Sequence, residues 1–247
     1  MTTAKRRKKL TGRRGFVALA MAALGASLPG TARAQAKPAT PPVRSKAPVQ
    51  RARLPRRLAA DFHDHIETRL PPLRLPFEAA ARETGLEWRM IAALAYQESR
   101  WRPAAVSPRG AQGVMMLMPQ TARKMGVDNV FSPDENILGG ARYLAYMKER
   151  IPKRITDPDR TWMAIAAYNI GIGHLEDARI ITQMRKKNPD RWSEVRGNLV
   201  RLSDPHWHER AKHGFANGRE TLQFVERVSQ FAAILETQVP DAVVVQD

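Results

Sequence analysis

Glu98 is the residue of this 247-residue chain whose placement points most directly to chemistry. In the helical pattern of residues 90–99, Glu98 continues an apolar stripe at the i, i+3, i+4 and i+7 spacing formed with Ile91, Leu94 and Ala95. A carboxyl group removed from water resists ionisation, so its pKa rises and it can donate a proton near neutral pH. The pattern predicts a general acid. A carboxylate that turns outward at the end of the helix is the alternative that helix geometry leaves open.

A glycine- and methionine-rich segment follows at residues 107–122, and it includes Gly113, Met115 and Met116. Methionines usually fill irregular space in a core. A glycine instead lets a backbone approach another group closely. The residue types alone therefore favour core packing for this segment.

The pattern of Glu98 recurs at residues 161–169, where Asn169 ends a stripe that contains Trp162, Ile165 and Ala166. A buried amide needs hydrogen-bond partners. On helix geometry alone, the favoured interpretation is that Asn169 ends the helix before Gly171, because Asn and Gly often end helices.

These motifs occur in a fixed order: the Glu98-Ser99 pair, the turn at residues 113–116, and the triplet at residues 167–169. In this order the chain resembles the transglycosylase SLT domain of the family 1 lytic transglycosylases, most closely the transglycosylase F branch, from about residue 76 to the region of residue 226. The resemblance implies a lysozyme-like fold with Glu98 as the catalytic residue. The substrate-binding residues that it implies are Ser99, Gly113, Met115, Met116, Tyr168 and Asn169. Only this resemblance implies that residues 113–116 form a wall of a substrate cleft.

The reaction implied by the resemblance is cleavage of the β-1,4 bond between N-acetylmuramic acid and N-acetylglucosamine in peptidoglycan glycan strands. Glu98 would protonate the linking oxygen and then, as a carboxylate, accept the proton of the sugar's own C6 hydroxyl group. Ring closure gives a 1,6-anhydromuramoyl end. This chemistry needs no metal and no cofactor.

Two other functions remain open. A muramidase resembling goose-type lysozyme shares the fold but releases a reducing end, and an ordinary hydrolase needs a second carboxylate, for which Glu83, Glu87, Asp128 and Asp134 are candidates. A non-catalytic peptidoglycan-binding protein is the second alternative. It is consistent with two departures from the family pattern, Met116 in place of a frequent glutamine and Phe224 in place of a usual tyrosine. The joint presence of Glu98, Tyr168 and Asn169 argues for the enzyme.

Residues 1–34 have the features of a cleavable signal peptide. A basic start precedes an apolar stretch at residues 16–28, and Ala32-Arg33-Ala34 provides a cleavage site before Gln35. Arg13 and Arg14 are compatible with twin-arginine export as well as the Sec route. The sequence has no cysteine to acylate, so we expect an exported, periplasmic protein that is not a lipoprotein.

Residues 35–57 are rich in Pro, Ala and basic residues, which predicts a disordered linker. Of the formal net charge of +17, eight basic residues lie in 1–34 and seven in 35–57, with no acidic residue in either segment, so residues 58–247 carry about +2. This distribution argues against a nucleic-acid-binding domain, which carries its basic patch on a folded face. The linker is expected to contact anionic envelope polymers or a membrane surface, or to act as a spacer without a partner.

Residues 58–247 are expected to form one all-α domain. Ser132 and Pro133 have the N-cap and first-position chemistry of a helix start, with Glu135 completing a capping box. Further helices are predicted from residue 119 and over residues 161–169 and 218–237. No segment shows the alternation of a strand.

The histidines near residue 210 do not predict a metal site. His206, His208 and His213 cluster there, but Lys212 stands where a His-Glu-x-x-His zinc motif needs its second histidine.

Overall fold

The computed structural model describes residues 54–240, which are helical without a β-strand, with only isolated bridges at residues 106, 112 and 117. The expected all-α class is confirmed. The predicted signal peptide and most of the predicted linker lie outside the described residues. The first helix begins at Arg56, so the last two residues of the predicted linker, Arg56 and Arg57, are helical.

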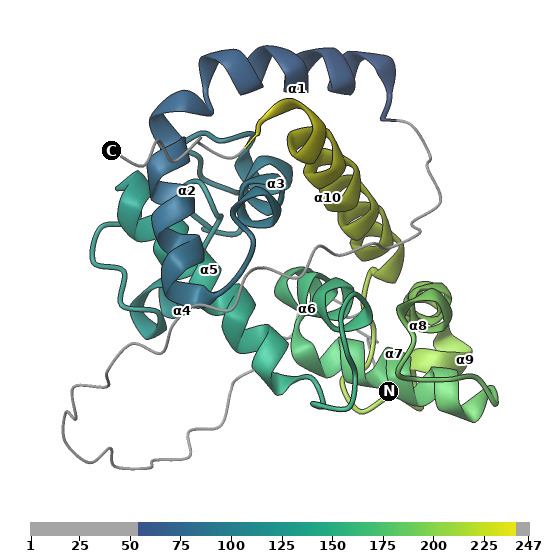
Figure 1. Ribbon diagram of the computed structural model, residues 1–247. Helices are drawn as coiled ribbons and strands as arrows, with labels where there is room; N and C mark the ends of the chain where they lie inside the picture. The colour runs from purple at the N-terminus through teal and green to yellow at the C-terminus, as the bar shows by residue number, and fades with distance from the viewer. Residues whose placement is uncertain (1–53, 241–247) are drawn as a thin grey trace, which may run out of the picture. The chain divides into compact units, whose positions relative to one another are not determined.

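Most helices of the described region are joined by short connections, and residues 100–118 form a longer one (Figure 1). In chain order they are α1 (Arg56–Thr68), α2 (Pro71–Thr84), α3 (Trp88–Ser99), α4 (Pro119–Lys124), α5 (Pro133–Arg150), α6 (Asp159–Ile170), α7 (Ile172–Met184), α8 (Trp192–Leu199), the 3-10 helix η1 (Val200–Ser203), α9 (Pro205–His208) and α10 (Gly218–Gln238).

Helix α5 begins as its sequence predicts, with the Ser132 side chain accepting a hydrogen bond from the backbone N–H of Glu135. The capping-box expectation for Glu135 is wrong. Its carboxylate accepts hydrogen bonds from the backbone N–H groups of Asp128 and Asn129, at 2.9 and 2.8 Å. Glu135 therefore ties the preceding turn to the first turn of α5.

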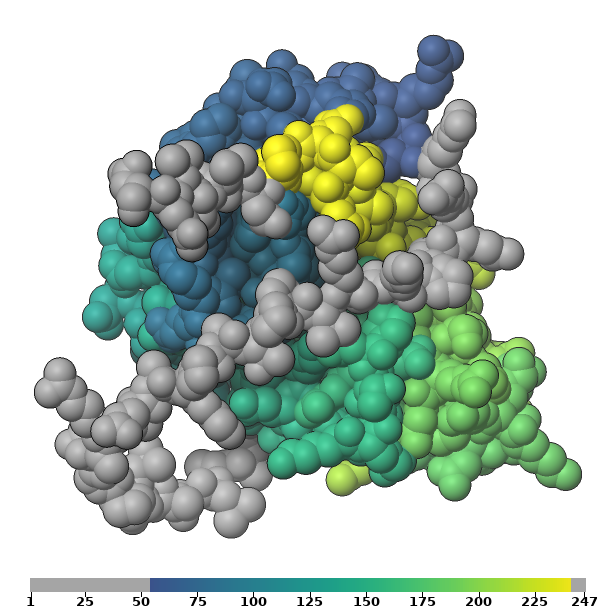
Figure 2. Space-filling view, in the orientation of Figure 1, coloured from purple at the N-terminus to yellow at the C-terminus, as the bar shows by residue number. Residues whose placement is uncertain are grey.

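An aromatic cluster holds α3 in the core. The ring of Tyr96 on α3 packs against Phe62 of α1 and Phe231 of α10, with centroid distances of 4.4 and 4.7 Å. Trp101 joins the same cluster and donates its indole N–H to the carbonyl oxygen of Ala92 at 2.8 Å. In Figure 2 the yellow atoms of α10 lie against the blue atoms of the first helices. The end of α3 that carries Glu98 is therefore fixed by large, fully buried rings.

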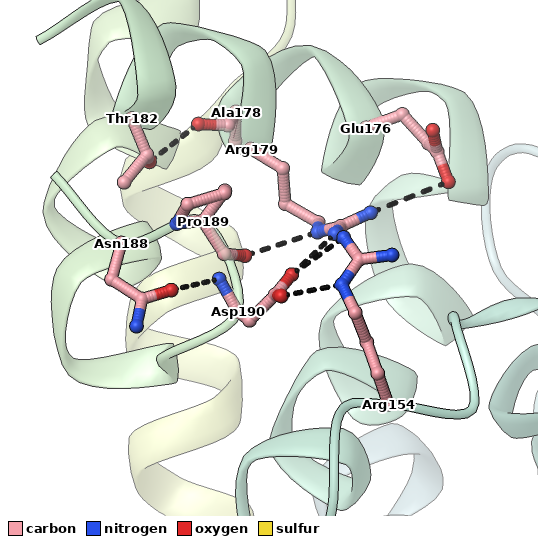
Figure 3. Close-up of polar contacts among 8 residues, drawn as sticks. All are labelled: Arg154, Glu176, Ala178, Arg179, Thr182, Asn188, Pro189 and Asp190. Atoms are coloured by element: carbon pink, nitrogen blue, oxygen red, sulfur yellow. Dashed lines mark hydrogen bonds and ion pairs between the residues drawn. The ribbon is translucent and has the colours of Figure 1, made fainter. Parts of the chain in front are cut away.

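A network of ion pairs holds the second half of the chain together (Figure 3). Asp190, just before α8, accepts two hydrogen bonds from Arg154 at 2.6 and 3.0 Å and a third from Arg179 of α7 at 2.8 Å. Arg179 also donates to the carbonyl oxygen of Pro189 at 3.1 Å. This network fixes the loop after α5 and the loop before α8 to one face of α7.

No helix in residues 54–240 combines the length and apolar character that a membrane span requires.

Candidate active site

Glu98 lies in the last turn of α3, whose first residues are stabilised by a cap from Glu87. Ile91, Leu94 and Ala95 are fully buried, and Glu98 itself is half-buried, as its stripe predicts. The Glu98 carboxyl group forms no hydrogen bond or ion pair with any residue of the described region. Desolvation by burial raises the pKa of Glu98 to about 8. At neutral pH this carboxyl group therefore holds a proton that it can donate.

The backbone of residues 112–117 forms a tight loop beside the end of α3. The N–H and C=O groups of Gln112 and Leu117 are paired with each other at 2.9 Å in both directions. Gly113 has a φ of +79°, and a Cβ there would lie 2.3 Å from the carbonyl oxygen of Val130 and from the side-chain nitrogen of Asn136. Only glycine satisfies both conditions.

Three side chains from three helices bind consecutive parts of this loop. Ser99 of α3 donates to the carbonyl oxygen of Val114 at 2.7 Å. Tyr168 of α6 donates to the carbonyl oxygen of Met115 at 2.8 Å. The fully buried Asn136 of α5 accepts from the N–H of Met115 at 2.7 Å and donates to the carbonyl oxygen of Gln112 at 3.1 Å.

Asn136 is a site residue that sequence reasoning missed. It lies on the buried face of α5 with Ile137, Gly140 and Ala141. A polar residue on an apolar helical stripe is the signal that singled out Glu98, so the same test applied to residues 133–150 would have found it.

Tyr168 is 9% exposed and packs edge-on against Tyr143 with a centroid distance of 5.0 Å. Burial raises the pKa of Tyr168 well above its ordinary value, and the negative charges of Glu98 and Tyr143 raise it further. The effect of the Glu98 charge places the carboxyl group and the phenol in one electrostatic environment. The charges of Glu98 and Tyr168 are thus close enough to interact.

The two methionines of the loop have different surroundings. Met115 is fully buried, and a Cβ added at Gly140 of α5 would lie 2.5 Å from the Met115 Cβ. Met116 is half-buried and has a left-handed φ of +49°. Met115 therefore fills the core beneath the loop, while Met116 lies at its surface.

Asn169 does not share the burial of the rest of its stripe. Trp162, Ile165 and Ala166 are buried, whereas Asn169 is exposed and its side-chain oxygen accepts a hydrogen bond from Thr221 of α10 at 2.8 Å. The helix ends after Ile170, one residue beyond Asn169. Asn169 thus links α6 to α10 at the protein surface.

Ser99 is only 1% exposed, and its hydroxyl group also accepts a hydrogen bond from the N–H of Arg102 at 3.1 Å. Both hydrogen-bonding roles of the hydroxyl group are therefore occupied by backbone groups.

The four acids considered as a second carboxylate lie in other surroundings. Glu83 pairs with Arg142 at 2.6 Å, and Asp128 and Asp134 are exposed. Glu87 caps the opposite end of α3, about 16 Å from Glu98 along the helix. No charged neighbour contributes to the raised pKa of Glu98, which results from burial. Among the described residues, Glu98 is the single carboxyl group whose pKa is raised above its ordinary value by burial.

Residues 54–240 contain no group of three or more His, Asp or Glu side chains arranged to hold a metal ion. The backbone N–H of His213 donates instead to the buried Asp177 at 2.9 Å.

Comparison with known proteins connects this geometry to a family. The family model for the transglycosylase SLT domain matches residues 76–190. Membrane-bound lytic murein transglycosylase F from Pseudomonas fluorescens (strain Pf0-1) is 45% identical over 177 residues, which cover 72% of this chain and 36% of that protein. The protein of the same name from Marinobacter nauticus is 45% identical over 177 residues, covering 72% of this chain and 35% of that protein. The chain thus spans about a third of the length of these relatives.

Among solved structures, the 70 kDa soluble lytic transglycosylase from Escherichia coli is 25% identical, with a TM-score of 0.46, and the match covers 71% of this chain and 26% of that one. The lytic transglycosylase Slt from Pseudomonas aeruginosa is 28% identical, with a TM-score of 0.44, over 65% of this chain and 23% of that chain.

Proposed function

This chain belongs to the transglycosylase SLT family through residues 76–190, and from that premise we propose that it is a lytic transglycosylase that cleaves peptidoglycan glycan strands. The observation that carries the proposal is the state of Glu98. Its carboxyl group is desolvated, is unpaired within the described region, and has a pKa of about 8, beside a loop held in place by three helices. That combination suits a group that must first give and then take back one proton.

In the proposed reaction, Glu98 donates its proton to the oxygen that links N-acetylmuramic acid to the next N-acetylglucosamine. The bond between that oxygen and C1 of the muramic acid breaks, and positive charge develops at C1. The Glu98 carboxylate then accepts the proton of the C6 hydroxyl group as O6 bonds to C1. Glu98 is again protonated, and no water is consumed.

The residues around Glu98 divide into two groups. Ser99, Gly113, Met115 and Tyr168 are proposed to act through the loop, because their side chains or backbones are engaged in holding residues 112–117. Met116 and Asn169 have accessible surface and are the members of the predicted set proposed to contact sugar directly.

Product chemistry tests the proposal. The chain is incubated with purified peptidoglycan, and the soluble products are analysed by mass spectrometry, in parallel with E98Q and with E149Q, which changes an exposed carboxylate of α5. The proposal requires anhydromuropeptides from the wild type and E149Q and none from E98Q. Reducing ends would identify a muramidase. Wall binding without any product would identify a non-catalytic binding protein.

Location is a separate proposal. A periplasmic protein processed after Ala34 would have Gln35 as its first residue, which N-terminal sequencing of the exported chain tests. Deletion of residues 35–57 is proposed to reduce sedimentation with cell walls at low salt, because seven basic residues are lost. Unchanged sedimentation would remove the proposed role of this segment.

A further inference from the structure

Two adjoining hollows flank α3 and α10 and share Gln97 and Arg227 as lining residues. The larger has a volume of about 330 Å³ and the smaller about 140 Å³. The larger is also lined by Asn169, Glu220, Gln223 and Phe224, and the smaller by Leu58, Tyr96, Arg100 and Phe231. One water molecule takes up about 30 Å³ in the liquid, so the space exceeds the needs of a few solvent molecules.

Gln97 and Arg227 lie at the junction of these hollows and have no polar partner within residues 54–240. Both side chains are half-buried, and neither forms a hydrogen bond or ion pair with any residue of the described region. The adjacent Glu226 is paired with Arg196, and Arg100 lies 3.6 Å from Asp61. A partly desolvated guanidinium and amide without partners lose hydrogen bonds to water that a ligand can replace.

The hollows lie along one face of α10. Glu220, Phe224, Arg227 and Phe231 follow each other at the i, i+4, i+7 and i+11 spacing of a single helical stripe. At the Phe231 end the stripe is fully buried in the aromatic cluster, and at the Glu220 end it is exposed. Arg100 and Arg227 line the hollows toward the Phe231 end, and the carboxylate of Glu220 lies at the opposite end. This face therefore suits an elongated ligand that carries both an anionic and a cationic group.

The larger hollow reaches one of the proposed substrate-binding residues, Asn169. Gln97 directly precedes Glu98, and Asn169 directly follows Tyr168. Asn169, which is proposed to contact sugar, lines the larger hollow itself, so a substituent of a sugar bound at Asn169 would adjoin the hollow.

Given the proposed function, on which this inference rests, we propose that the hollow between α3 and α10 binds the peptide attached to N-acetylmuramic acid, with a carboxylate of that peptide on Arg227. Guanidinium and carboxylate groups form strong two-point hydrogen bonds. Gln97 offers an amide to the peptide backbone, Phe224 an apolar surface, and Glu220 a carboxylate for a free amine. The chain would then recognise the peptide as well as the glycan.

The experiment compares three soluble ligands binding to the full chain with Glu98→Gln, so that none is cleaved. They are peptide-bearing glycan, the same glycan after removal of its peptides by an amidase, which leaves only the lactyl carboxylate, and N-acetylglucosamine oligomers, which have neither group. We expect R227Q to weaken binding of the peptide-bearing glycan at least tenfold relative to the peptide-free glycan. R219Q, which removes an exposed arginine of α10 outside the hollows, should leave the ratio unchanged.

Each other result overturns the inference. An equal loss for all three ligands would make Arg227 a structural residue, and a selective loss for the peptide-free glycan would assign it to the lactyl carboxylate. R227K is a second variant in case R227Q misfolds, because lysine keeps the positive charge but cannot form two parallel hydrogen bonds with a carboxylate. If R227K has the same ratio of affinities for peptide-bearing and peptide-free glycan as the chain with Arg227, the proposal is contradicted. If wild-type chain binds and cleaves none of these glycans, the proposed function itself fails; cleavage without peptide dependence removes this inference alone.

Discussion

The hydroxyl group of Tyr168 donates a 2.8 Å hydrogen bond to the carbonyl oxygen of Met115. Helix α6 therefore helps to fix the position of the loop beside Glu98. We expect Y168F to lower kcat and to cost about 1 to 3 kcal/mol of unfolding free energy, because the buried Met115 carbonyl group loses its partner. Urea denaturation and turnover on peptidoglycan measure both. Y143F is the matched control, since the Tyr143 hydroxyl group has no hydrogen-bond partner in the described region. A Y143F variant as impaired as Y168F would contradict this role.

Stability should depend on the ionisation of Glu98. Its folded-state pKa of about 8 lies above the ordinary value of 4.5, so between these pH values the folded state binds more protons than the unfolded state. Unfolding free energy therefore falls as pH rises from about 5 to 8, by an amount on the order of a few kcal/mol. Urea denaturation across this range should show the decline in the wild type and a shallower one in E98Q. Parallel curves for the two proteins would rule out a desolvated Glu98.

Asn136 should matter to catalysis beyond its contribution to stability. N136A leaves the Met115 N–H and the Gln112 carbonyl group without their partner, at a cost of about 2 to 4 kcal/mol. Because residues 112–117 then lose a fixed position, kcat should fall more than KM rises.

The matched control for N136A is N198A. Asn198 is also buried, with hydrogen bonds from Arg185 and to Thr182, but it lies in α8. N198A should destabilise the protein to a similar extent and keep kcat. Equal losses of kcat in both variants would show that global stability, not loop position, limits turnover.

Gly113 should tolerate no side chain. G113A combines a left-handed φ of +79° with contacts of 2.3 Å to Val130 and Asn136, so we expect a loss of about 2 to 4 kcal/mol in unfolding free energy. Gly110 has a similar φ of +85° but open space around it. G110A should therefore cost only about 1 kcal/mol, and thermal unfolding of the two variants separates crowding from backbone strain. Similar costs would show that crowding at Gly113 is relieved by local movement.

Acid should weaken the network around Asp190. Hydrogen bonds from Arg154, and next from Arg179, hold the pKa of Asp190 below its ordinary value against the opposing effect of burial. Its stabilising effect is present above the unfolded pKa and is lost as pH falls through the folded pKa. We expect D190N to cost about 1 kcal/mol at pH 7, because the network is partly exposed, and less near pH 3. D64N changes an exposed carboxylate of α1 that has no hydrogen bond or ion pair within the described part of the chain, and it should cost little at either pH.

The sequence by itself determined the local features of this protein. Helical spacing placed Glu98 on the buried stripe of α3, and Ser132 and Pro133 marked the start of α5, because caps and amphipathic stripes are set by residues within a few positions of each other. The ordered motifs also indicated the family that the comparison over residues 76–190 bears out.

Only the tertiary structure decided which groups meet. The stripe of α6 predicted burial of Asn169, but α10 leaves that residue at the surface, bonded to Thr221. Asn136 joins the loop across 21 positions of sequence, and Tyr168 joins it across 53. Local periodicity carries no information about contacts at such separations, because they depend on how the helices pack. The raised pKa of Glu98 likewise depends on the burial that all these elements produce together.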